Sequence, residues 1–385
     1  MNSGFNISTI CKVKFVFSIS LLTITLQGFS QDFNKQNYSG IAADYHYGKV
    51  IPTNPFVKGE NLKGEPLKYY QSLSIKMLWQ NPGYTDWQKV YHIPYYGFGV
   101  FAGDFYNPDE LGYPIAIYGV LGIPIRRWNK FALYSEFQFG MAFNWQHYDS
   151  INNPKNLAIG GSMTVYLDIG MTAFYQISSK LDLGAGLSFL HFSNGGFERP
   201  NRGLNLYSPS FELKYHFAGK PNLNFVQKAD RLRRSNDLFL MLGYGDHQLN
   251  DHELDTNYFA VGGLSVIYFV QVSNALRIGA GTDINYFWGL NAKPDGTIGP
   301  RTLDNFTVGL ILQPEIIIDK LTLVGGFGIY TTHLNYLNFK QPYQRLGVRF
   351  EIYKNVSLGV NVRAINFMLA EFLEFNVGYR IKWEK

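Results

Sequence analysis

The stretch Leu369-Ala-Glu-Phe-Leu-Glu-Phe-Asn-Val-Gly-Tyr-Arg-Ile-Lys-Trp383 alternates apolar and polar side chains along most of its length. Its apolar positions are Leu369, Leu373, Phe375, Val377, Tyr379, Ile381 and Trp383, and its polar or small positions are Glu374, Asn376, Gly378, Arg380 and Lys382. Successive side chains of a β-strand point to opposite faces, so this pattern predicts a strand with one apolar and one polar face. Such a strand suits the wall of a transmembrane barrel, where the apolar face meets lipid and the polar face meets the lumen.

Segments of this kind recur through the chain, separated by clusters of Gly, Asn, Asp and Pro. We predict strands at 38–50, 67–80, 93–106, 113–126, 130–146, 161–176, 181–192, 204–217, 236–247, 257–270, 275–288, 304–318, 321–331, 343–353, 356–365 and 370–383. The count is sixteen, or fourteen if neighbouring segments merge. The sequence therefore predicts an all-β fold, a transmembrane antiparallel β-barrel of about 14–16 strands.

The composition agrees with this class and argues against others. Aromatic residues make up 17 % of the chain and charged residues 16 %, against roughly 25 % charged residues in soluble domains. No apolar run after residue 30 reaches the roughly 18 residues that a membrane-spanning helix needs. The 34 Lys and Arg residues barely exceed the 29 Asp and Glu residues, so we expect no nucleic-acid partner.

Residues 1–30 have the pattern of a secretory signal peptide. A positive region and a short apolar run precede two small residues, Gly28 and Ser30, at the expected cleavage point. We therefore expect 31–385 to be the mature chain. The single cysteine, Cys11, lies within the signal, so we expect neither a disulfide nor thiol catalysis.

One long basic connection, 218–235, divides the mature chain into two runs of eight predicted strands. The first run, 31–217, ends in the hairpin 181–217, which carries the candidate site described below, and the second run is 236–385. We favour a single barrel over the whole mature chain. The alternative is two tandem eight-stranded units, because sequence sets the size of a barrel poorly.

The strand count sets the orientation of the barrel. An exported chain begins in the periplasm, so odd-numbered strands run outward. The segment 181–192 is the seventh, which places the loop 194–203 outside the cell. We therefore expect a protein of the outer membrane of a Gram-negative bacterium, with this loop at the outer leaflet.

This hairpin carries one group of residues suited to ester hydrolysis. His191 and Ser193 are two positions apart on a strand and so point the same way, and Asn205 begins the return strand at the same rim. A serine nucleophile needs a base to take its proton, and the base needs a third group to hold it. We therefore predict Ser193 as nucleophile, His191 as base and Asn205 as the orienting group. The candidates for binding the oxyanion are the amides of Asn194 and Gly195 and the side chain of Asn201.

The runs His-x-Ser-Asn-Gly at 191–195 and Pro-Asn-x-Gly-x-Asn at 200–205 resemble the active-site hairpin of the outer-membrane lipid A 3-O-deacylases, the PagL-type family. The chain most resembles the longer acyloxyacyl hydrolases of the Bacteroidetes, and further matching stretches are Asn152–Gly160, Tyr343–Gly347 and Glu371–Tyr379. The resemblance implies a barrel that cleaves an ester-linked acyl chain of lipid A with a Ser–His–Glu triad on its lipid-facing surface. It implies Ser193 and His191 as catalytic residues, no cofactor, and lipid A or lipopolysaccharide of the outer leaflet, among other outer-membrane lipids, as the partner.

The sequence departs from that family at the third member of the triad. The deacylase glutamate falls on position 205, which is Asn205 here, and the loop residue Glu198 is the alternative third member. An asparagine at this spacing resembles outer-membrane phospholipase A, which has its own His-x-Ser-Asn-Gly motif and would imply calcium and dimerisation.

We rank a phospholipid hydrolase of that kind second and a porin or structural barrel without enzymatic activity third. The oligomeric state stays open, and no metal ligands are predicted. Arg199 and Arg202 are candidates for contacts with lipid A phosphates, since arginine binds anions through two parallel hydrogen bonds.

Overall fold

The structure is a computed structural model that describes residues 36–223, 229–230, 235–248, 258–289, 303–331, 342–366 and 369–384. The predicted signal peptide at 1–30 lies outside the described residues. Within the described ranges, no helix is long and apolar enough to cross a membrane.

Sixteen strands form within the described residues. The first eight are β1 (Ser39–Val50), β2 (Tyr69–Trp79), β3 (Tyr95–Asp104), β4 (Gly112–Arg127), β5 (Phe131–Trp145), β6 (Thr164–Gln176), β7 (Leu181–Ser193) and β8 (Leu204–His216). The second eight are β9 (Ser235–Gln248), β10 (Tyr258–Gln271), β11 (Leu276–Phe287), β12 (Phe306–Ile318), β13 (Leu321–Tyr330), β14 (Pro342–Tyr353), β15 (Val356–Ile365) and β16 (Leu369–Glu384). The predicted set of sixteen strands is confirmed, and no strand end differs from its prediction by more than three residues.

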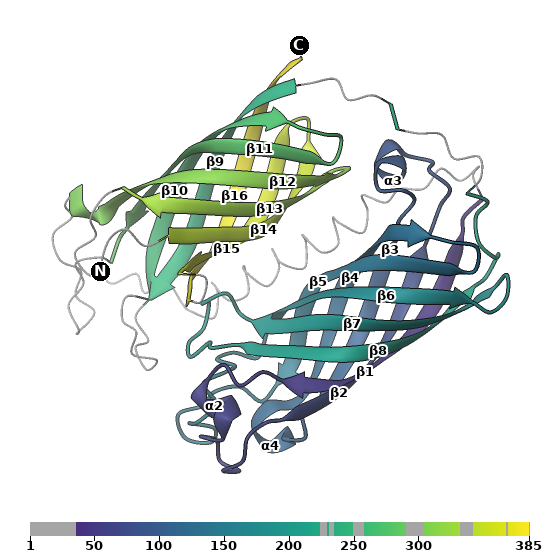
Figure 1. The fold of residues 1–385 in the computed structure, drawn as a ribbon. Helices are drawn as coiled ribbons and strands as arrows, with labels where there is room; N and C mark the ends of the chain where they lie inside the picture. Colours follow the sequence, from purple (N-terminus) through teal and green to yellow (C-terminus); the bar gives the residue numbers. More distant parts are fainter. Residues whose placement is uncertain are drawn as a thin grey trace.

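These strands close into two barrels (Figure 1). β1 pairs with β2 on one side and with β8 on the other, and β9 closes the second barrel by pairing with β10 and β16. The prediction of one barrel over the whole mature chain is therefore wrong, and its alternative of two tandem eight-stranded units is confirmed. The alternation along each strand is the same in both cases. Whether the first eight strands close depends on whether β8 pairs with β1, as it does here through Gly40 and His216, or with β9. The alternation within a strand does not distinguish these two pairings.

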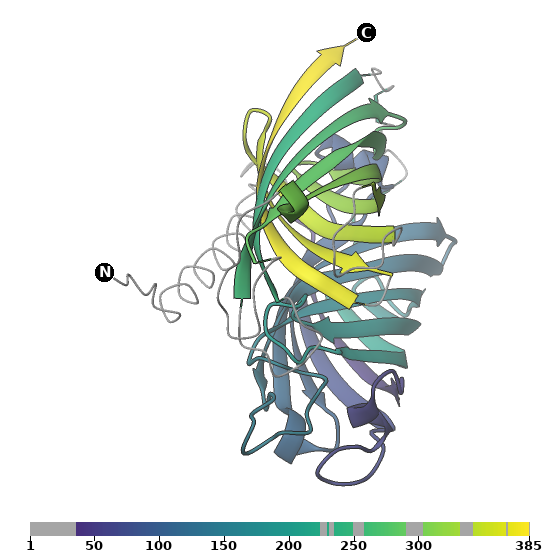
Figure 2. The same cartoon turned by 90° about the vertical axis from the view of Figure 1, so that its left-hand side faces the viewer.

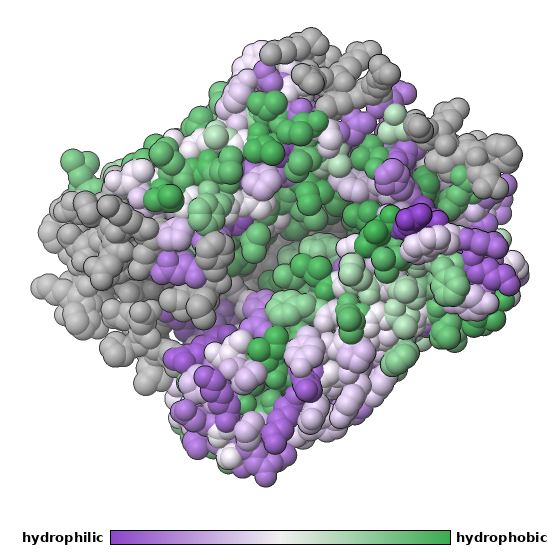
Figure 3. Space-filling model, viewed as in Figure 1, coloured by the Kyte–Doolittle hydropathy of each residue, from purple (hydrophilic) through white to green (hydrophobic). Residues whose placement is uncertain are grey.

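The two faces of each strand have opposite environments, as the alternation predicts. In β8, the outward Phe211 is 62 % exposed, whereas the next residue, Glu212, points inward and is 2 % exposed. The other exposed outward positions of this strand are Tyr207, Pro209, Leu213 and Tyr215. Figure 3 shows apolar residues along the visible walls of both barrels and hydrophilic residues gathered around the loops at one end of the first barrel. Apolar walls around a polar interior are the arrangement of a membrane-spanning barrel.

The two ends of the barrels have different connections. We call the end that follows odd-numbered strands the loop end, and the opposite end the turn end. At the loop end of the first barrel lie α2 (Pro55–Lys58), α4 (Pro108–Leu111) and the connections 146–163 and 194–203. At the turn end of the second barrel the connections shrink to a few residues, such as 319–320 and 354–355. One larger element, α3 (Asp86–Val90), lies at the turn end of the first barrel, and Figures 1 and 2 show it on the side away from α2 and α4.

Paired charges fill the interior of each barrel. In the first barrel, Lys76 Nζ lies 2.9 Å from Asp44, 2.7 Å from Glu136 and 2.8 Å from Glu212, and the lysine side chain is fully buried. In the second barrel, the central charge is Glu315, and its partners Arg277, Arg349 and Arg380 lie at 2.6, 2.6 and 2.9 Å. Eight-stranded barrels have room inside only for side chains, so these groups neutralise one another instead of lining an open channel.

We expect the substitution Lys76→Ala to lower the free energy of unfolding of the first barrel by about 3–5 kcal/mol, because three buried carboxylates lose the cation they share. Urea titration of the refolded protein in detergent measures the effect. The control Lys130→Ala removes an exposed lysine and should change stability by less than about 0.5 kcal/mol. Equal unfolding midpoints for the two variants would contradict the structural role given to Lys76.

Candidate active site

The direction of His191 and Ser193 is set by the residue between them. Phe192 points into the first barrel and is fully buried. Its ring lies 5.0 Å from that of Trp145 and 5.6 Å from that of Tyr166, measured between ring centroids. Because neighbouring positions on a strand face opposite ways, this buried anchor turns the side chains of His191 and Ser193 to the outside of the barrel.

The hairpin brings the three predicted residues into one hydrogen-bonded chain. His191 Nε2 lies 2.9 Å from Ser193 Oγ, and His191 Nδ1 lies 2.7 Å from Asn205 Oδ1. His191 and Asn205 are directly paired across β7 and β8, so the strand register itself produces the second contact. All three side chains are half-buried at the loop end of these strands.

The acceptor on Asn205 fixes the protonation of the imidazole. An amide oxygen only accepts hydrogen bonds, so the proton of neutral His191 lies on Nδ1. The lone pair on Nε2 then faces the hydroxyl of Ser193. This is the tautomer in which a histidine can take a proton from a serine.

The turn after Ser193 is organised by two asparagines. The backbone N–H of Asn194 donates to Asn201 Oδ1 at 3.0 Å, and Asn194 Oδ1 accepts from the amides of Gly196 and Phe197 at 3.0 and 3.1 Å. The amide of Asn194 and the oxygen of Asn201 are thus engaged with each other. Among the described residues, no hydrogen-bond acceptor is found for the N–H of Gly195, so this donor is not already engaged. Asn201 uses its oxygen in the contact with Asn194, and its Nδ2 group is a second donor beside the turn.

The other predicted residues of the loop lie around this turn. The carboxylate of Glu198 lies against Gly161. A Cβ added to Gly161 would clash with Glu198 Oε2. The Glu198 side chain therefore points to the connection between β5 and β6, and Asn205 is the hydrogen-bond partner of His191 Nδ1. Arg199 is half-buried and Arg202 is exposed.

The connection between β5 and β6 supports the loop from the side. The amides of Arg202 and Gly203 donate to the carbonyls of Leu157 and Ala158, each at 3.0 Å. Asn54, which caps α2, also donates to the carbonyl of Gly203 at 2.9 Å. Sequence reasoning gave no role to Asn54 or Gly203, although Gly203 lies within the quoted Pro-Asn-x-Gly run.

Gly203 is required by a close approach to the histidine. Its φ is +68°, and an added Cβ would lie 2.9 Å from Phe192 O and 3.2 Å from His191 Cε1. We expect Gly203→Ala to lower the catalytic rate at least tenfold, because the methyl group displaces the imidazole while the barrel stays closed. Kinetics on the folded variant measure this, with Gly219→Ala, at the turn end and also at positive φ, as the control. Equal rates for the two variants would count against the contact.

The surface beside Ser193 is apolar and open to the outside of the barrel. Leu187 and Phe189 share the outward face of β7 with His191 and Ser193, and they are 69 % and 41 % exposed. The hydrogen-bonded chain therefore lies at the edge of an apolar outer wall of the barrel.

Comparison with known families gives two matches. A model described as lipid A 3-O-deacylase (PagL) matches residues 73–214, and a model described as the C-terminal domain of acyloxyacyl hydrolase matches residues 234–383. Together they match most of the chain.

The chain belongs to the PagL family. The first match covers most of the first barrel with Ser193, His191 and Asn205, and the second match spans the second barrel.

A search of curated proteins gave no match. Solved structures similar to this PagL-family chain include an outer membrane channel from Pseudomonas putida F1, which is 9 % identical with 92 % of this chain and 100 % of that chain covered, at a TM-score of 0.20. They also include OccAB3 from Acinetobacter baumannii (11 %, 90 % and 99 %, TM-score 0.23) and a mutant porin from Rh. blastica (11 %, 90 % and 100 %, TM-score 0.18). TM-scores this low do not indicate a shared barrel geometry.

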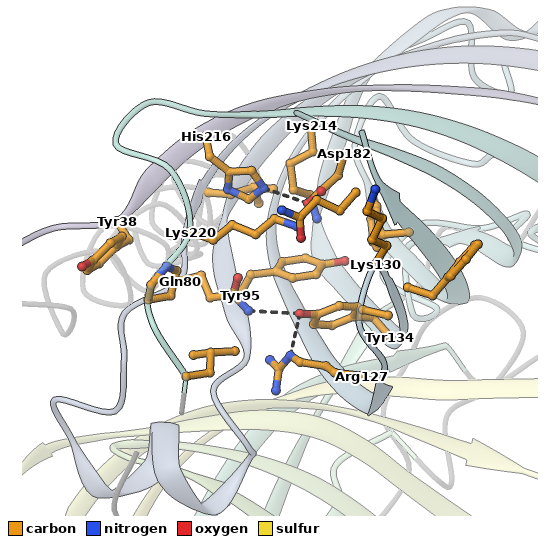
Figure 4. A pocket seen from close by; sticks show the side chains of 18 of the residues that line it. Tyr38, Gln80, Tyr95, Arg127, Lys130, Tyr134, Asp182, Lys214, His216 and Lys220 are labelled. Atoms are coloured by element: carbon orange, nitrogen blue, oxygen red, sulfur yellow. Dashed lines mark hydrogen bonds and ion pairs between the residues drawn. The ribbon is translucent and has the colours of Figure 1, made fainter. Parts of the chain in front are cut away.

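The PagL-family chain also has a cavity of about 430 Å³, at the turn end of the first barrel and far from Ser193 (Figure 4). Several of its charged groups already have partners. Asp182 binds Lys220 at 2.5 Å and His216 at 2.9 Å, and Arg127 donates to the hydroxyl of Tyr134 at 3.2 Å. The cavity and the chain of contacts from Ser193 to Asn205 thus lie at opposite ends of the first barrel.

One group of acidic residues in the described part of this PagL-family chain has the spacing of a metal site. It consists of Asp44, Glu136 and Glu212 inside the first barrel. The ammonium group of Lys76 lies among their oxygens at 2.7–2.9 Å and takes the place that a cation would need.

Proposed function

We propose that this chain is a serine esterase of the outer membrane that removes an ester-linked acyl chain from lipid A. The observation that carries the proposal is the chain of contacts from Ser193 through His191 to Asn205 on the lipid-facing wall of the first barrel. Membership of the PagL family supports lipid A as the substrate class and the outer membrane as the location.

The reaction proceeds through an acyl-enzyme. Ser193 Oγ attacks the carbonyl carbon of the ester while its proton passes to His191 Nε2. The amide of Gly195 donates to the negative oxygen of the tetrahedral intermediate. The intermediate collapses, the C–O bond of the ester breaks, and His191 returns the proton to the departing hydroxyl group.

Water completes the cycle by the same route. It attacks the acyl group on Ser193, gives its proton to His191, and releases the fatty acid as Ser193 Oγ takes the proton back. Throughout, Asn205 holds the imidazole so that Nε2 faces the reacting oxygen. None of these steps calls for a cofactor.

We place the site at the outer leaflet. Bacterial barrels have long extracellular loops and short periplasmic turns, and most of the long connections follow odd-numbered strands, at the end that carries Ser193. The exceptions are the connection with α3 and the segment that joins the two barrels. Lipid A can therefore enter sideways from the membrane without passing through the barrel. Arg199 and Arg202 lie in the same loop and are suited to contacts with its phosphates.

Mass spectrometry of the reaction products tests this proposal. Purified protein is incubated with lipid A and, separately, with phosphatidylethanolamine in the same detergent. We expect lipid A that has lost one ester-linked acyl chain, together with one equivalent of free fatty acid. Intact lipid A after incubation with the folded protein would refute the proposal.

A second candidate function is hydrolysis of phospholipids. It is favoured by Asn205, because a neutral third member resembles outer-membrane phospholipase A and departs from the glutamate of the deacylases. In this case the same incubations would give lysophospholipid, with lipid A left intact, and the rate would depend on added calcium.

A further inference from the structure

The second barrel is the part of the molecule that this mechanism leaves without a role. It contains none of Ser193, His191 and Asn205, yet it lies beside the first barrel (Figures 1 and 2). The two barrels touch at both ends, and the contact at the loop end falls on the turn that follows Ser193.

The turn residues Gly195 and Gly196 lie directly against β15 and β16. A Cβ added to Gly195 would lie 3.1 Å from Val362 Cγ2 and 3.3 Å from Leu373 Cδ1. A Cβ added to Gly196 would lie 3.1 Å from the carbonyl oxygen of Ala370. The backbone of the turn is therefore in van der Waals contact with the outside of the second barrel, without space for a further methyl group.

The contacting residues are in positions that otherwise face lipid. Val362 and Leu373 are paired across β15 and β16, and both lie on the outward faces of these strands. A third strand adds a polar contact, since the phenol of Tyr258 in β10 is hydrogen-bonded to the backbone of Arg199. Three strands of the second barrel thus hold the segment 195–199.

The opposite ends of the barrels are also joined, which fixes this arrangement. The hydroxyl of Tyr91, at the end of α3, donates to the carbonyl of Ile317 at 2.7 Å. Trp87 and Tyr91 pack in one apolar cluster with Ile318 of β12. These contacts at the turn end hold the second barrel beside the first, and so help to keep it in contact with residues 195–199 at the loop end.

The turn needs such support because of its glycines. Gly195 and Gly196 have φ values of +69° and +84°, and two adjacent glycines have many other conformations open to them. Ordering each costs roughly 1–2 kcal/mol of backbone entropy. An oxyanion donor is effective only if its N–H is already aimed before the charge forms, and the proposed function assigns this part to the N–H of Gly195.

We infer that the second barrel completes the active site, with Val362 and Leu373 as positioning residues that hold the Gly195 amide toward the oxyanion of the reaction. The inference rests on the proposed function, since it assigns these residues a role in the same esterase site. It makes the tandem arrangement a requirement for full activity, because neither barrel alone contains all the groups that the site uses.

The test is the double variant Val362→Ala/Leu373→Ala, compared with the matched double variant Val270→Ala/Leu312→Ala. Val270 and Leu312 are outward-facing residues of the same barrel, 45 % and 54 % exposed, on β10 and β12. We expect the first variant to lower kcat for lipid A at least tenfold with KM changed by less than about twofold, because the contact acts on the transition state. The matched variant should have wild-type kinetics, and Leu373→Met, which keeps the volume of the side chain, should retain most of the activity.

Hydrogen exchange of the backbone amides gives a second measurement that does not depend on catalysis. Peptides covering 192–199 should exchange faster in Val362→Ala/Leu373→Ala than in the wild type or the matched variant. An unchanged kcat in an active enzyme, or unchanged exchange, would overturn the inference. If the wild-type protein releases no fatty acid, yet peptides 192–199 exchange faster in Val362→Ala/Leu373→Ala than in the wild type, the proposed function is refuted and the contact between the barrels is supported.

Discussion

The substitution Ser193→Ala is expected to lower the rate of acyl release from lipid A by roughly 10⁴-fold or more. It removes the nucleophile, so the acyl-enzyme can no longer form, and the amide of Gly195 and the lipid-facing wall can supply only a small part of the catalysis. His191→Ala should cause a loss of similar size. The double variant should be little worse than either single one, because a nucleophile and its base act as a unit. Rates of fatty acid release by purified proteins measure all three.

The control for this prediction is Ser179→Ala. Ser179 is an exposed serine in the connection between β6 and β7, at the turn end, and its removal should leave the rate unchanged. Each variant should also keep the electrophoretic mobility of a folded barrel in unheated samples. A folded Ser193→Ala protein with more than a tenth of the wild-type rate would show that another group is the nucleophile.

The strands and their faces could be predicted because the signal is local. In β16, the outward Val377 and Tyr379 alternate with the buried Asn376 and Arg380, as the alternation in the sequence indicates. Each residue reports its own environment, lipid or lumen, so no knowledge of the partner strand is needed.

The number of barrels could not be predicted in this way. It depends on whether β8 returns to β1 or continues to β9, and either choice gives β8 the same outward and inward residues. The long connection 218–235 was the one local sign of a division. What decides closure is the sum of distant pairings, such as Gly40 with His216 and Glu374 with Gly245, together with an interior whose charges neutralise one another within each barrel.

The hydrogen-bonded group Ser193–His191–Asn205 could also be predicted from the sequence, because its signal is local too. A short hairpin has few registers, so a His-x-Ser run and an asparagine at the start of the return strand meet at one rim. The residues that support the site could not be predicted from the sequence. Asn54 and Val362 come from distant parts of the chain, and only the folded arrangement brings them to the turn.

The variant Asn205→Leu is expected to lower kcat by about 100-fold or more. Without the acceptor at 2.7 Å, the imidazole of His191 can rotate or take the other tautomer, in which Nε2 carries the proton and cannot accept one from Ser193. The substitution keeps a side chain of similar size on a face that already meets lipid, so the barrel should fold. Binding of lipid A does not involve this hydrogen bond, and KM should therefore change much less than kcat.

The isosteric variant Asn205→Asp separates the two functions of the third group. A carboxylate keeps the hydrogen bond to Nδ1–H and also stabilises the imidazolium that forms in the transition state, so its kcat should equal or exceed that of the wild type. The charge is tolerated because the position lies at the rim of the barrel, where charged groups on the lipid face cost little. Glu198→Gln removes the other candidate carboxylate and should leave kcat nearly unchanged. The reverse result, with Asn205→Leu active and Glu198→Gln inactive, would mean that the loop carboxylate leaves Gly161 and reaches His191 during the reaction.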